Sequence, residues 1–147
     1  MRIELTLNGR PTTLEVRTDE MLAEALELRE TCAIGVCGAC TVLLDGEPVT
    51  GCLTLAATVA GHEITTVEGL DEADPVLRAF NEAHAFQCGW CTPGFVLTAK
   101  ALLDESPEPS PEQVTEALGG NLCRCGSYVK IADAVRIAVR ELREGAA

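Results

Sequence analysis

Basic residues are scarce in this sequence of 147 residues. Lys and Arg together number 11 against 23 Asp and Glu, which gives a formal net charge of −12 at pH 7, and no basic run occurs. Nucleic acids and anionic membrane surfaces are bound through positively charged protein surfaces. Both classes of partner are therefore poor candidates for this chain.

Membrane-spanning and secretory segments are also lacking. The longest apolar stretches fall far short of the roughly 20 residues that a transmembrane helix needs. Residues 1–9 contain neither the apolar region of a secretory signal nor a twin-arginine pair. We therefore expect a cytoplasmic protein without a membrane span. Eight cysteines would suggest disulfides in a secreted chain, but here they favour metal binding.

Familiar catalytic signatures are missing from the sequence. It has no Ser/His/Asp set, no glycine fingerprint of a dinucleotide-binding fold and no Walker loop. We therefore predict no catalytic residue in this chain. Substrate chemistry would lie in a partner, while this chain would position and tune its own redox groups.

Cysteine is the residue that the sequence does have in quantity, and the eight fall into two groups of four. The first cysteine group has the spacing C-x4-C-x2-C-x11-C and consists of Cys32, Cys37, Cys40 and Cys52. The second cysteine group has the spacing C-x2-C-x31-C-x-C and consists of Cys88, Cys91, Cys123 and Cys125. No cysteine is left over, which predicts two separate four-thiolate sites.

The first cysteine group has the spacing of a plant-type ferredoxin, in which four thiolates hold one [2Fe–2S] cluster. Gly35, Gly38 and Ala39 are small enough for the backbone to wrap a cluster and to direct N–H groups at its sulfurs. The alternative is a structural zinc site, but zinc sites favour two C-x2-C pairs. We therefore expect a [2Fe–2S] cluster rather than zinc.

The second cysteine group begins with a C-x2-C pair that could be a thioredoxin-like dithiol. That motif needs a preceding strand in a βαβ unit, whereas residues 77–84 have a helical pattern. A dithiol would also leave Cys123 and Cys125 unexplained, whereas a second four-thiolate cluster site uses all four residues. A helix that starts at Thr92 would direct its positive N-terminal dipole toward an anionic cluster.

Hydrophobic periodicity changes from two to 3.6 near residues 69–74, which predicts an α+β chain with one domain over residues 1–72 and another over residues 73–147. In the first domain we expect strands over 3–7, 12–17, 41–44, 49–52 and 63–67 and a helix over 19–29. Asn8-Gly9 and Asp45-Gly46 mark tight hairpin turns. Thr18 or Asp19 could cap the helix.

In the second domain we expect helices over 75–85, 92–104, 111–118 and 128–142. Thr92 could cap the second of them, and Ser110 with Gln113 forms a capping box for the third. The last helix should bury Val129, Ile131, Ala132, Val135, Ala138, Val139 and Leu142. Domains of about 70 residues have marginal cores, so we predict that the iron-free chain is at best partly folded.

Three motifs carry a resemblance to a known family. Residues 37–42 (CGACTV), 87–94 (QCGWCTPG) and 120–126 (GNLCRCG) resemble the signatures of the small [2Fe–2S] subunit of molybdenum hydroxylases. This is the family of xanthine dehydrogenase, aldehyde oxidase and aerobic carbon monoxide dehydrogenase. The similarity runs from about residue 3 to residue 142, and paired motifs at this separation are highly specific.

The resemblance implies an N-terminal β-grasp ferredoxin-like domain followed by a C-terminal four-helix [2Fe–2S]-binding domain. It also implies a large partner subunit with molybdopterin and, in most members, a medium subunit with FAD. Gln87 and Cys125 would contact the molybdopterin, and the second-group cluster would lie beside it. The first-group cluster would face the flavin. The implied function is electron transfer from molybdopterin through two [2Fe–2S] clusters to flavin or an external acceptor.

The alternative to an enzyme subunit is a stand-alone two-cluster ferredoxin-type electron carrier. The segment from Leu28 to Cys32 is also shorter than is usual in the family, and Thr31 stands where glycine is usual. We predict that this short segment exposes the first cluster and changes its reduction potential. Trp90 could shield the second cluster or pack in a core.

Overall fold

A hairpin forms the first edge of the sheet. In the computed structural model, which describes residues 1–145, β1 (Arg2–Leu7) pairs antiparallel with β2 (Arg10–Glu15). Asn8 and Gly9 have φ angles of 51° and 75°. Positive φ at both central residues is what a type I′ hairpin turn requires, so the predicted Asn8-Gly9 turn is confirmed.

A second hairpin and a short central strand complete the sheet. β3 (Thr41–Leu44) pairs antiparallel with β4 (Glu47–Thr50) across Asp45 and Gly46, which also have positive φ. β5 (Glu63–Thr65) lies between β1 and β3, which gives the order β2-β1-β5-β3-β4. The β1–β5 pair is parallel, and the β3–β5 pair is antiparallel. Three 3-10 turns follow the hairpin, η1 (Gly51–Leu53), η2 (Ala56–Val59) and η3 (Val67–Gly69).

The predicted helix over 19–29 is wrong in length and in its cap. α1 covers only Leu22–Ala25, and Met21 precedes it without a side-chain cap. Glu27 has a φ of 50°, a left-handed conformation that helical residues do not adopt. The chain turns there, and Leu28 packs against the buried Ala23, Cys40 and Cys52. Packing of the first cysteine group therefore outweighs the helical periodicity.

Four helices make up the rest of the described chain. They are α2 (Pro75–Glu82), α3 (Thr92–Glu105), α4 (Pro111–Leu118) and α5 (Tyr128–Gly145). The capping box is confirmed, since Ser110 Oγ accepts from the Gln113 N–H and Gln113 Oε1 accepts from the Ser110 N–H. The predicted cap of α3 is wrong by one residue, because Cys91 and not Thr92 occupies that position.

The buried face of α5 is largely as predicted. Ile131, Val135 and Ala138 are buried, together with Ala134, which the prediction omitted. Val129 was predicted to be buried but is 72% exposed. It lies in the first turn of α5, next to the loop of Cys123 and Cys125, where no helix covers it.

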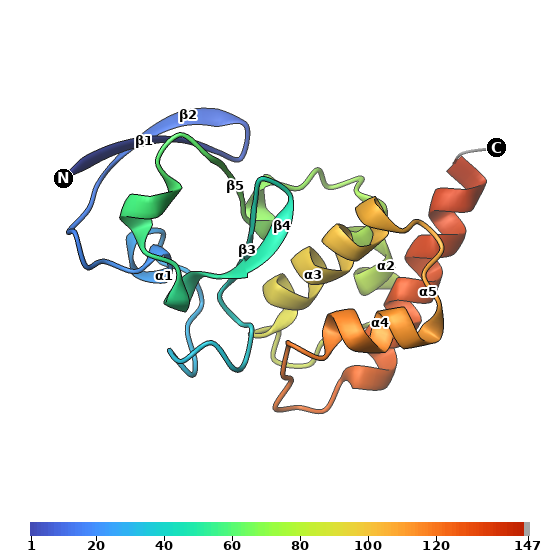
Figure 1. Ribbon diagram of the computed structural model, residues 1–147. Coiled ribbons are helices and arrows are strands. Elements are labelled where there is room, and N and C mark those ends of the chain that lie inside the picture. Colours follow the sequence, from blue (N-terminus) through green and yellow to red (C-terminus); the bar gives the residue numbers. More distant parts are fainter. Residues whose placement is uncertain (146–147) are drawn as a thin grey trace.

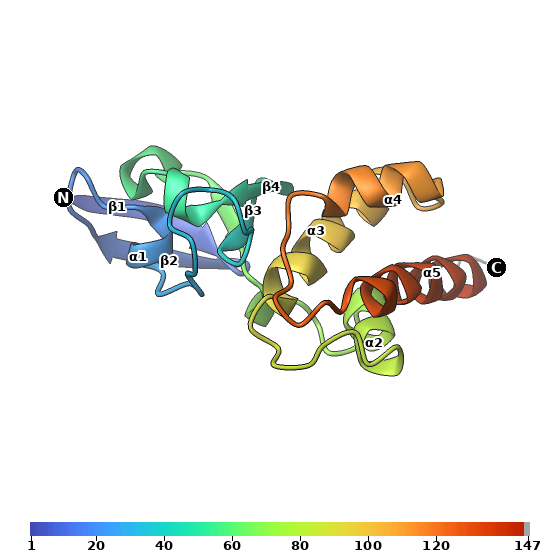
Figure 2. The same ribbon diagram turned by 90° about the horizontal axis from the view of Figure 1, so that it is seen from below.

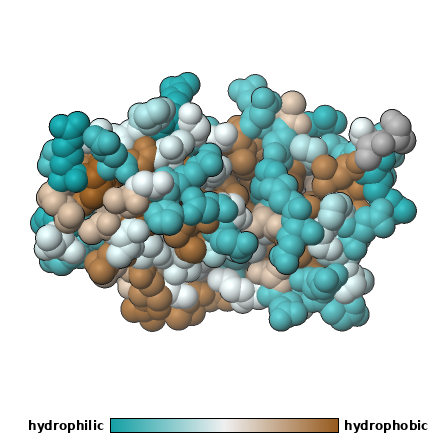
Figure 3. Space-filling view, turned by 45° about the horizontal axis from the view of Figure 1, so that its top comes forward, coloured by the Kyte–Doolittle hydropathy of each residue, from teal (hydrophilic) through white to brown (hydrophobic). Residues whose placement is uncertain are grey.

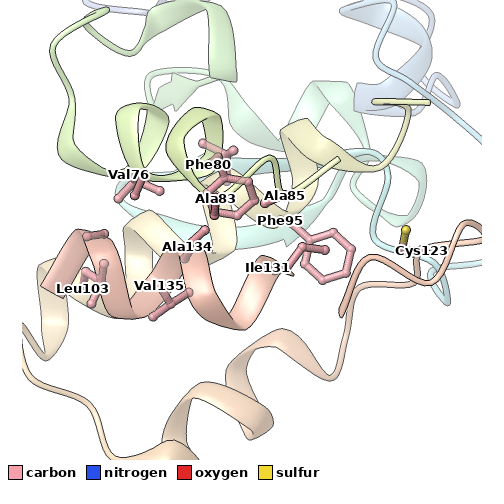
Figure 4. Packing of buried hydrophobic residues seen from close by; sticks show 14 residues of the cluster. Val76, Phe80, Ala83, Ala85, Phe95, Leu103, Cys123, Ile131, Ala134 and Val135 are labelled. Atoms are coloured by element: carbon pink, nitrogen blue, oxygen red, sulfur yellow. The ribbon is translucent and has the colours of Figure 1, made fainter. Parts of the chain in front are cut away.

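Buried hydrophobic residues within 1–145 form two large cores and one small cluster of Ala23, Cys40 and Cys52. The core of the sheet half includes Leu5, Leu22, Val42 and Ile64, while that of the helical half lies between α2, α3 and α5. Figure 4 shows Cys123 at one end of this helical core, beyond Phe95. α3 also packs against β3 and joins the two halves, which lie side by side in Figures 1 and 2.

The fold is thus mixed α+β with a five-stranded sheet and several helices, which is the predicted class. Of the helices within residues 1–145, none has both the length and the apolarity needed to cross a membrane.

Candidate functional site

The two cysteine groups meet where the sheet half joins the helical half. Their loops run together along the lower edge of Figure 1, below α3. No disulfide occurs within the part of the chain that the structure describes, so all eight cysteines are free.

Backbone N–H groups surround the sulfurs of the first cysteine group. Val36 and Cys37 donate to Cys32 Sγ over 3.3 and 3.4 Å, and the Cys52 N–H donates to Cys40 Sγ over 3.4 Å. Cys37, Cys40 and Cys52 are buried, whereas Cys32 is half-buried. N–H donors stabilise negative charge on sulfur, which is what a thiolate ligand needs.

The second cysteine group is more open to solvent. Cys123 is buried and Cys91 is half-buried, but Cys88 and Cys125 are exposed. The Ser127 N–H donates to Cys123 Sγ over 3.4 Å. The structure brings Gln87 beside this group, because its Nε2 donates to the carbonyl oxygen of Cys125 over 3.1 Å.

Some thiols are favoured as thiolates by their surroundings. The pKa of Cys32 is lowered to about 6 by backbone N–H groups, of which that of Ile34 has the largest effect. The pKa of Cys88 is also lowered, first by the backbone N–H of Trp90 and then by Cys125. A thiolate is the form of cysteine that binds metal.

Other thiols are held protonated until a metal replaces the proton. Burial, followed by a hydrogen bond with Cys40, raises the pKa of Cys52 to about 11. Burial, followed by a hydrogen bond with Cys123, raises the pKa of Cys91 to about 12. Metal binding at such sites releases protons, because each ligand must be deprotonated.

These interactions join the thiols in pairs within each group. The pairs are Cys32 with Cys37, Cys40 with Cys52, Cys88 with Cys125, and Cys91 with Cys123. Among residues 1–145, no three His, Cys, Asp or Glu side chains lie close enough together to share one metal ion. Four thiols in each group are the donor set that a [2Fe–2S] cluster requires.

Hydrogen bonds connect the two groups directly. The Leu122 N–H, next to Cys123, donates to the carbonyl oxygen of Cys37 over 2.8 Å. Asn121 Nδ2 donates to the carbonyl oxygen of Gly38 over 3.1 Å, and its Oδ1 accepts from the hydroxyl of Thr98 over 3.0 Å. Asn121 and Thr98 are buried, and the sequence prediction missed both. Asn121 lies within the motif over residues 120–126, which was the available signal for it, whereas Thr98 has no sequence signature for such a role.

Glycine makes this close approach possible. Gly38 has a φ of 69°, and a Cβ there would lie 2.5 Å from Asn121 Nδ2. A Cβ on Gly94, in the first turn of α3, would lie 2.2 Å from the carbonyl oxygen of Gly38. Any larger residue at either position would push the two loops apart.

A cavity of about 360 Å³ lies between the loops. Its wall includes Cys88, Cys91 and Cys123 of the second group and Cys37 of the first. The sulfurs on its wall and its mostly apolar surroundings fit a cluster held on the second group. The donor set and the space therefore both suit the group that the spacing predicts.

Apolar side chains are exposed around both groups. Ile34, Val36 and Leu53 are exposed near the first, and Phe86, Trp90, Leu122, Tyr128 and Val129 near the second. Figure 3 shows hydrophobic surface gathered at the lower left of that view. Exposed apolar patches of this kind mark surfaces that a partner protein covers.

Comparison with protein families finds an iron–sulfur match in each half. Residues 11–80 match a 2Fe-2S iron-sulfur cluster binding domain, and residues 66–136 match a [2Fe-2S] binding domain.

Individual relatives match the chain over almost all of its length. It is 46% identical to the nicotinate dehydrogenase small FeS subunit of Eubacterium barkeri, with 93% of this chain and 94% of the relative covered. It is also 46% identical to the nicotine 6-hydroxylase small subunit of Paenarthrobacter nicotinovorans, with 92% and 87% covered. Both relatives are named as small subunits of oxidising enzymes.

Solved structures agree with these matches. A chain of quinoline 2-oxidoreductase from Pseudomonas putida 86 superposes with a TM-score of 0.92 at 41% identity, and 99% of this chain and 97% of that chain are covered. Aldehyde oxidoreductase from Desulfovibrio gigas gives a TM-score of 0.92 at 35% identity, and 99% of this chain covers 17% of that longer one.

Proposed function

The chain belongs to the family of small iron–sulfur subunits of molybdenum hydroxylases, and we propose that it carries electrons from a large molybdopterin-binding subunit through two [2Fe–2S] clusters. The acceptor is flavin on a FAD-binding medium subunit or an external acceptor. The chain binds no substrate itself. The substrate is oxidised on the partner, and a cytoplasmic location suits eight reduced cysteines.

The observation that carries this proposal is the contact between the two cysteine groups. The N–H of Leu122, the residue before Cys123 of the second group, donates over 2.8 Å to the carbonyl oxygen of Cys37 in the first group. Two redox centres held in such contact form a relay. A zinc protein with two structural sites would have no need for it.

We assign one cluster to each group. Cys32, Cys37, Cys40 and Cys52 hold the first cluster, and Cys88, Cys91, Cys123 and Cys125 hold the second. When bound, each cluster supplies one-electron redox chemistry. The protein residues hold the sulfurs, direct N–H groups at them and exclude water from the buried side. The N–H donors to the sulfurs of Cys32, Cys40 and Cys123 support this assignment.

The second cluster lies toward the molybdopterin-binding partner. Cys88 and Cys125 are exposed, and the Gln87 side chain is held against Cys125 at the same surface. Gln87 and Cys125 therefore lie at a surface where they could contact the molybdopterin of the partner. The exposed apolar residues around them supply the permanent interface that a subunit needs.

The two cysteine groups define two domains. We assign residues 1–72 to a β-grasp ferredoxin-type domain and the described residues from 73 to 145 to a four-helix [2Fe–2S]-binding domain. The separate sheet and helical cores support this division, as does the N-cap of α2 at Asp74.

Metal analysis of the tagged chain, purified gently with its partners, tests the function. We expect about four irons per chain from two clusters, with molybdenum on a large co-purifying chain. Iron without molybdenum or a partner would instead support the stand-alone two-cluster carrier. A colourless protein that contains zinc would contradict both. The Gln87 motif and the exposed apolar patches favour the subunit.

A further inference from the structure

Arg29 connects the segment before the first cysteine group to the loop of Cys88 and Cys91. Its Nη1 donates to the carbonyl oxygen of Gly89 and, over 3.4 Å, to that of Trp90. The guanidinium carbon also lies 5.4 Å from the centroid of the Trp90 ring, which is a cation–π distance. One side chain from the sheet half thus makes three contacts with the backbone and ring between two cysteines of the second group.

Thr31 adds a second attachment to the same loop. The indole Nε1–H of Trp90 donates to Thr31 Oγ1 over 2.9 Å. Trp90 is 50% exposed, so core packing does not account for its position. Arg29 and Thr31 hold it instead, and both lie in the short segment before Cys32.

The backbone of the Cys88–Cys91 loop is flexible at Gly89, so contacts with other segments must hold its carbonyl groups in place. Gly89 has a φ of 78°, and its backbone can move freely around that value because it has no side chain. The Gly89 and Trp90 peptide units lie directly between Cys88 and Cys91, so movement of this backbone would move both cysteines. The Arg29 contacts fix both of these peptide units.

We propose that Arg29 is a positioning residue for the second cysteine group, which fixes the Cys88–Cys91 loop and raises the reduction potential of the cluster bound there. The inference rests on the proposed function, because it requires a cluster on this group. One-electron reduction adds a negative charge, which a fixed neighbouring cation stabilises. The Arg29 side chain is exposed, so solvent and salt weaken this effect without removing it.

Three variants of the iron-loaded full chain separate charge from position. Arg29→Met removes the charge and the hydrogen bonds, Arg29→Lys keeps the charge without the planar fork, and Thr31→Val removes only the acceptor for Trp90. Arg143→Met is the matched control, because Arg143 lies fifteen residues beyond Tyr128 on α5, about 22 Å along the helix.

Two measurements apply to each variant. The first is the midpoint potential of each cluster in a redox titration followed spectroscopically. The second is quenching of tryptophan fluorescence by acrylamide, since Trp90 is the one tryptophan of the sequence. Iron content is determined in every sample beforehand.

We expect Arg29→Met to make the second-cluster potential more negative. At fixed potential the ratio of oxidised to reduced cluster should rise by up to about tenfold, which is about 59 mV for one electron. The first cluster should shift less. The second-cluster potential of Arg29→Lys should stay close to the wild-type value, and that of Thr31→Val should equal it. Acrylamide quenching of Trp90 should rise in all three variants.

Equal shifts in Arg29→Met and Arg143→Met, or a larger shift of the first cluster, would overturn the electrostatic role. Unchanged quenching in Arg29→Met and Thr31→Val would overturn the positioning role. A wild-type chain that cannot be loaded with about four irons contradicts the proposed function, and this inference with it. Normal iron with unchanged potentials and quenching overturns the inference alone.

Discussion

The two cysteine groups are built by opposite means. The first takes three of its cysteines from one short loop, keeps three of the four buried and is packed by Ala23 and Leu28. The second takes its ligands from two segments separated by 31 residues, and two of its cysteines are exposed. The first site therefore depends on local loop geometry, whereas the second depends on the packing of α3 and α5.

This difference matches the proposed direction of electron flow. An exposed site with apolar surroundings suits contact with the partner that supplies electrons. Buried ligands with N–H donors suit a cluster whose potential must be set by its own protein. Four predictions test the comparison, from the largest effect to the smallest.

Removal of iron should have the largest effect. Each half has a small core; Cys123 belongs to the helical core, while Cys40 and Cys52 form a separate small cluster with Ala23. Metal binding supplies part of the folding free energy of such domains. We expect the iron-free chain to lose its cooperative thermal transition, measured by circular dichroism before and after chelation. A cooperative transition in fully iron-free protein would contradict this.

Gly94→Ala should push the two groups apart. The new Cβ would lie 2.2 Å from the carbonyl oxygen of Gly38, so both loops must shift. Overpacking of this kind costs about 1–3 kcal/mol of the free energy of unfolding, and both clusters should change spectroscopically. Gly120→Ala is the control, since a Cβ there has no atom within 4 Å. Equal effects of the two substitutions would show that contact between the loops is not responsible.

Asn121→Ala should weaken the link between the halves without new bulk. The substitution leaves the Gly38 carbonyl oxygen without its amide donor and the Thr98 hydroxyl without its acceptor. Buried polar groups left unpaired cost about 1–3 kcal/mol, which chemical denaturation can measure. The exposed Asn81 provides a control, and Asn81→Ala should change the free energy of unfolding little. A cost for Asn121→Ala no larger than that of the control would mean that the link carries no stability.

Ser110→Ala should have the smallest effect and spare both clusters. It removes the capping box at the start of α4, at the end of the helix that is farther along the chain from Cys123. Loss of an N-cap costs about 1 kcal/mol, visible as a lower midpoint of unfolding. Both reduction potentials should stay at their wild-type values, and a shift in either would mean that α4 supports the site.

Several parts of this structure were predictable because their signals are local. The Asn8-Gly9 turn and the Ser110–Gln113 capping box each place a special residue where backbone geometry requires it. The two groups of four cysteines were likewise visible as spacings. Local signals need no knowledge of which distant segments meet.

Features that depend on tertiary contacts could not be predicted in the same way. The helical periodicity over 19–29 was overridden because the chain turns at Glu27 toward the first cysteine group. Val129 has the right period for burial but lies beyond the edge of the helical core. Asn121, Thr98 and Arg29 are important only because segments about 20 to 80 residues apart come together.

The central claim is that each cysteine group binds its own two-iron cluster, and iron content in a pair of variants tests it most directly. The wild-type chain should hold about four irons, and Cys37→Ser and Cys91→Ser should each hold about two. Cys37→Ser should retain the spectrum and potential of the second cluster, and Cys91→Ser those of the first. Four irons in either variant, or one tightly bound metal ion per group in the wild type, would contradict the account.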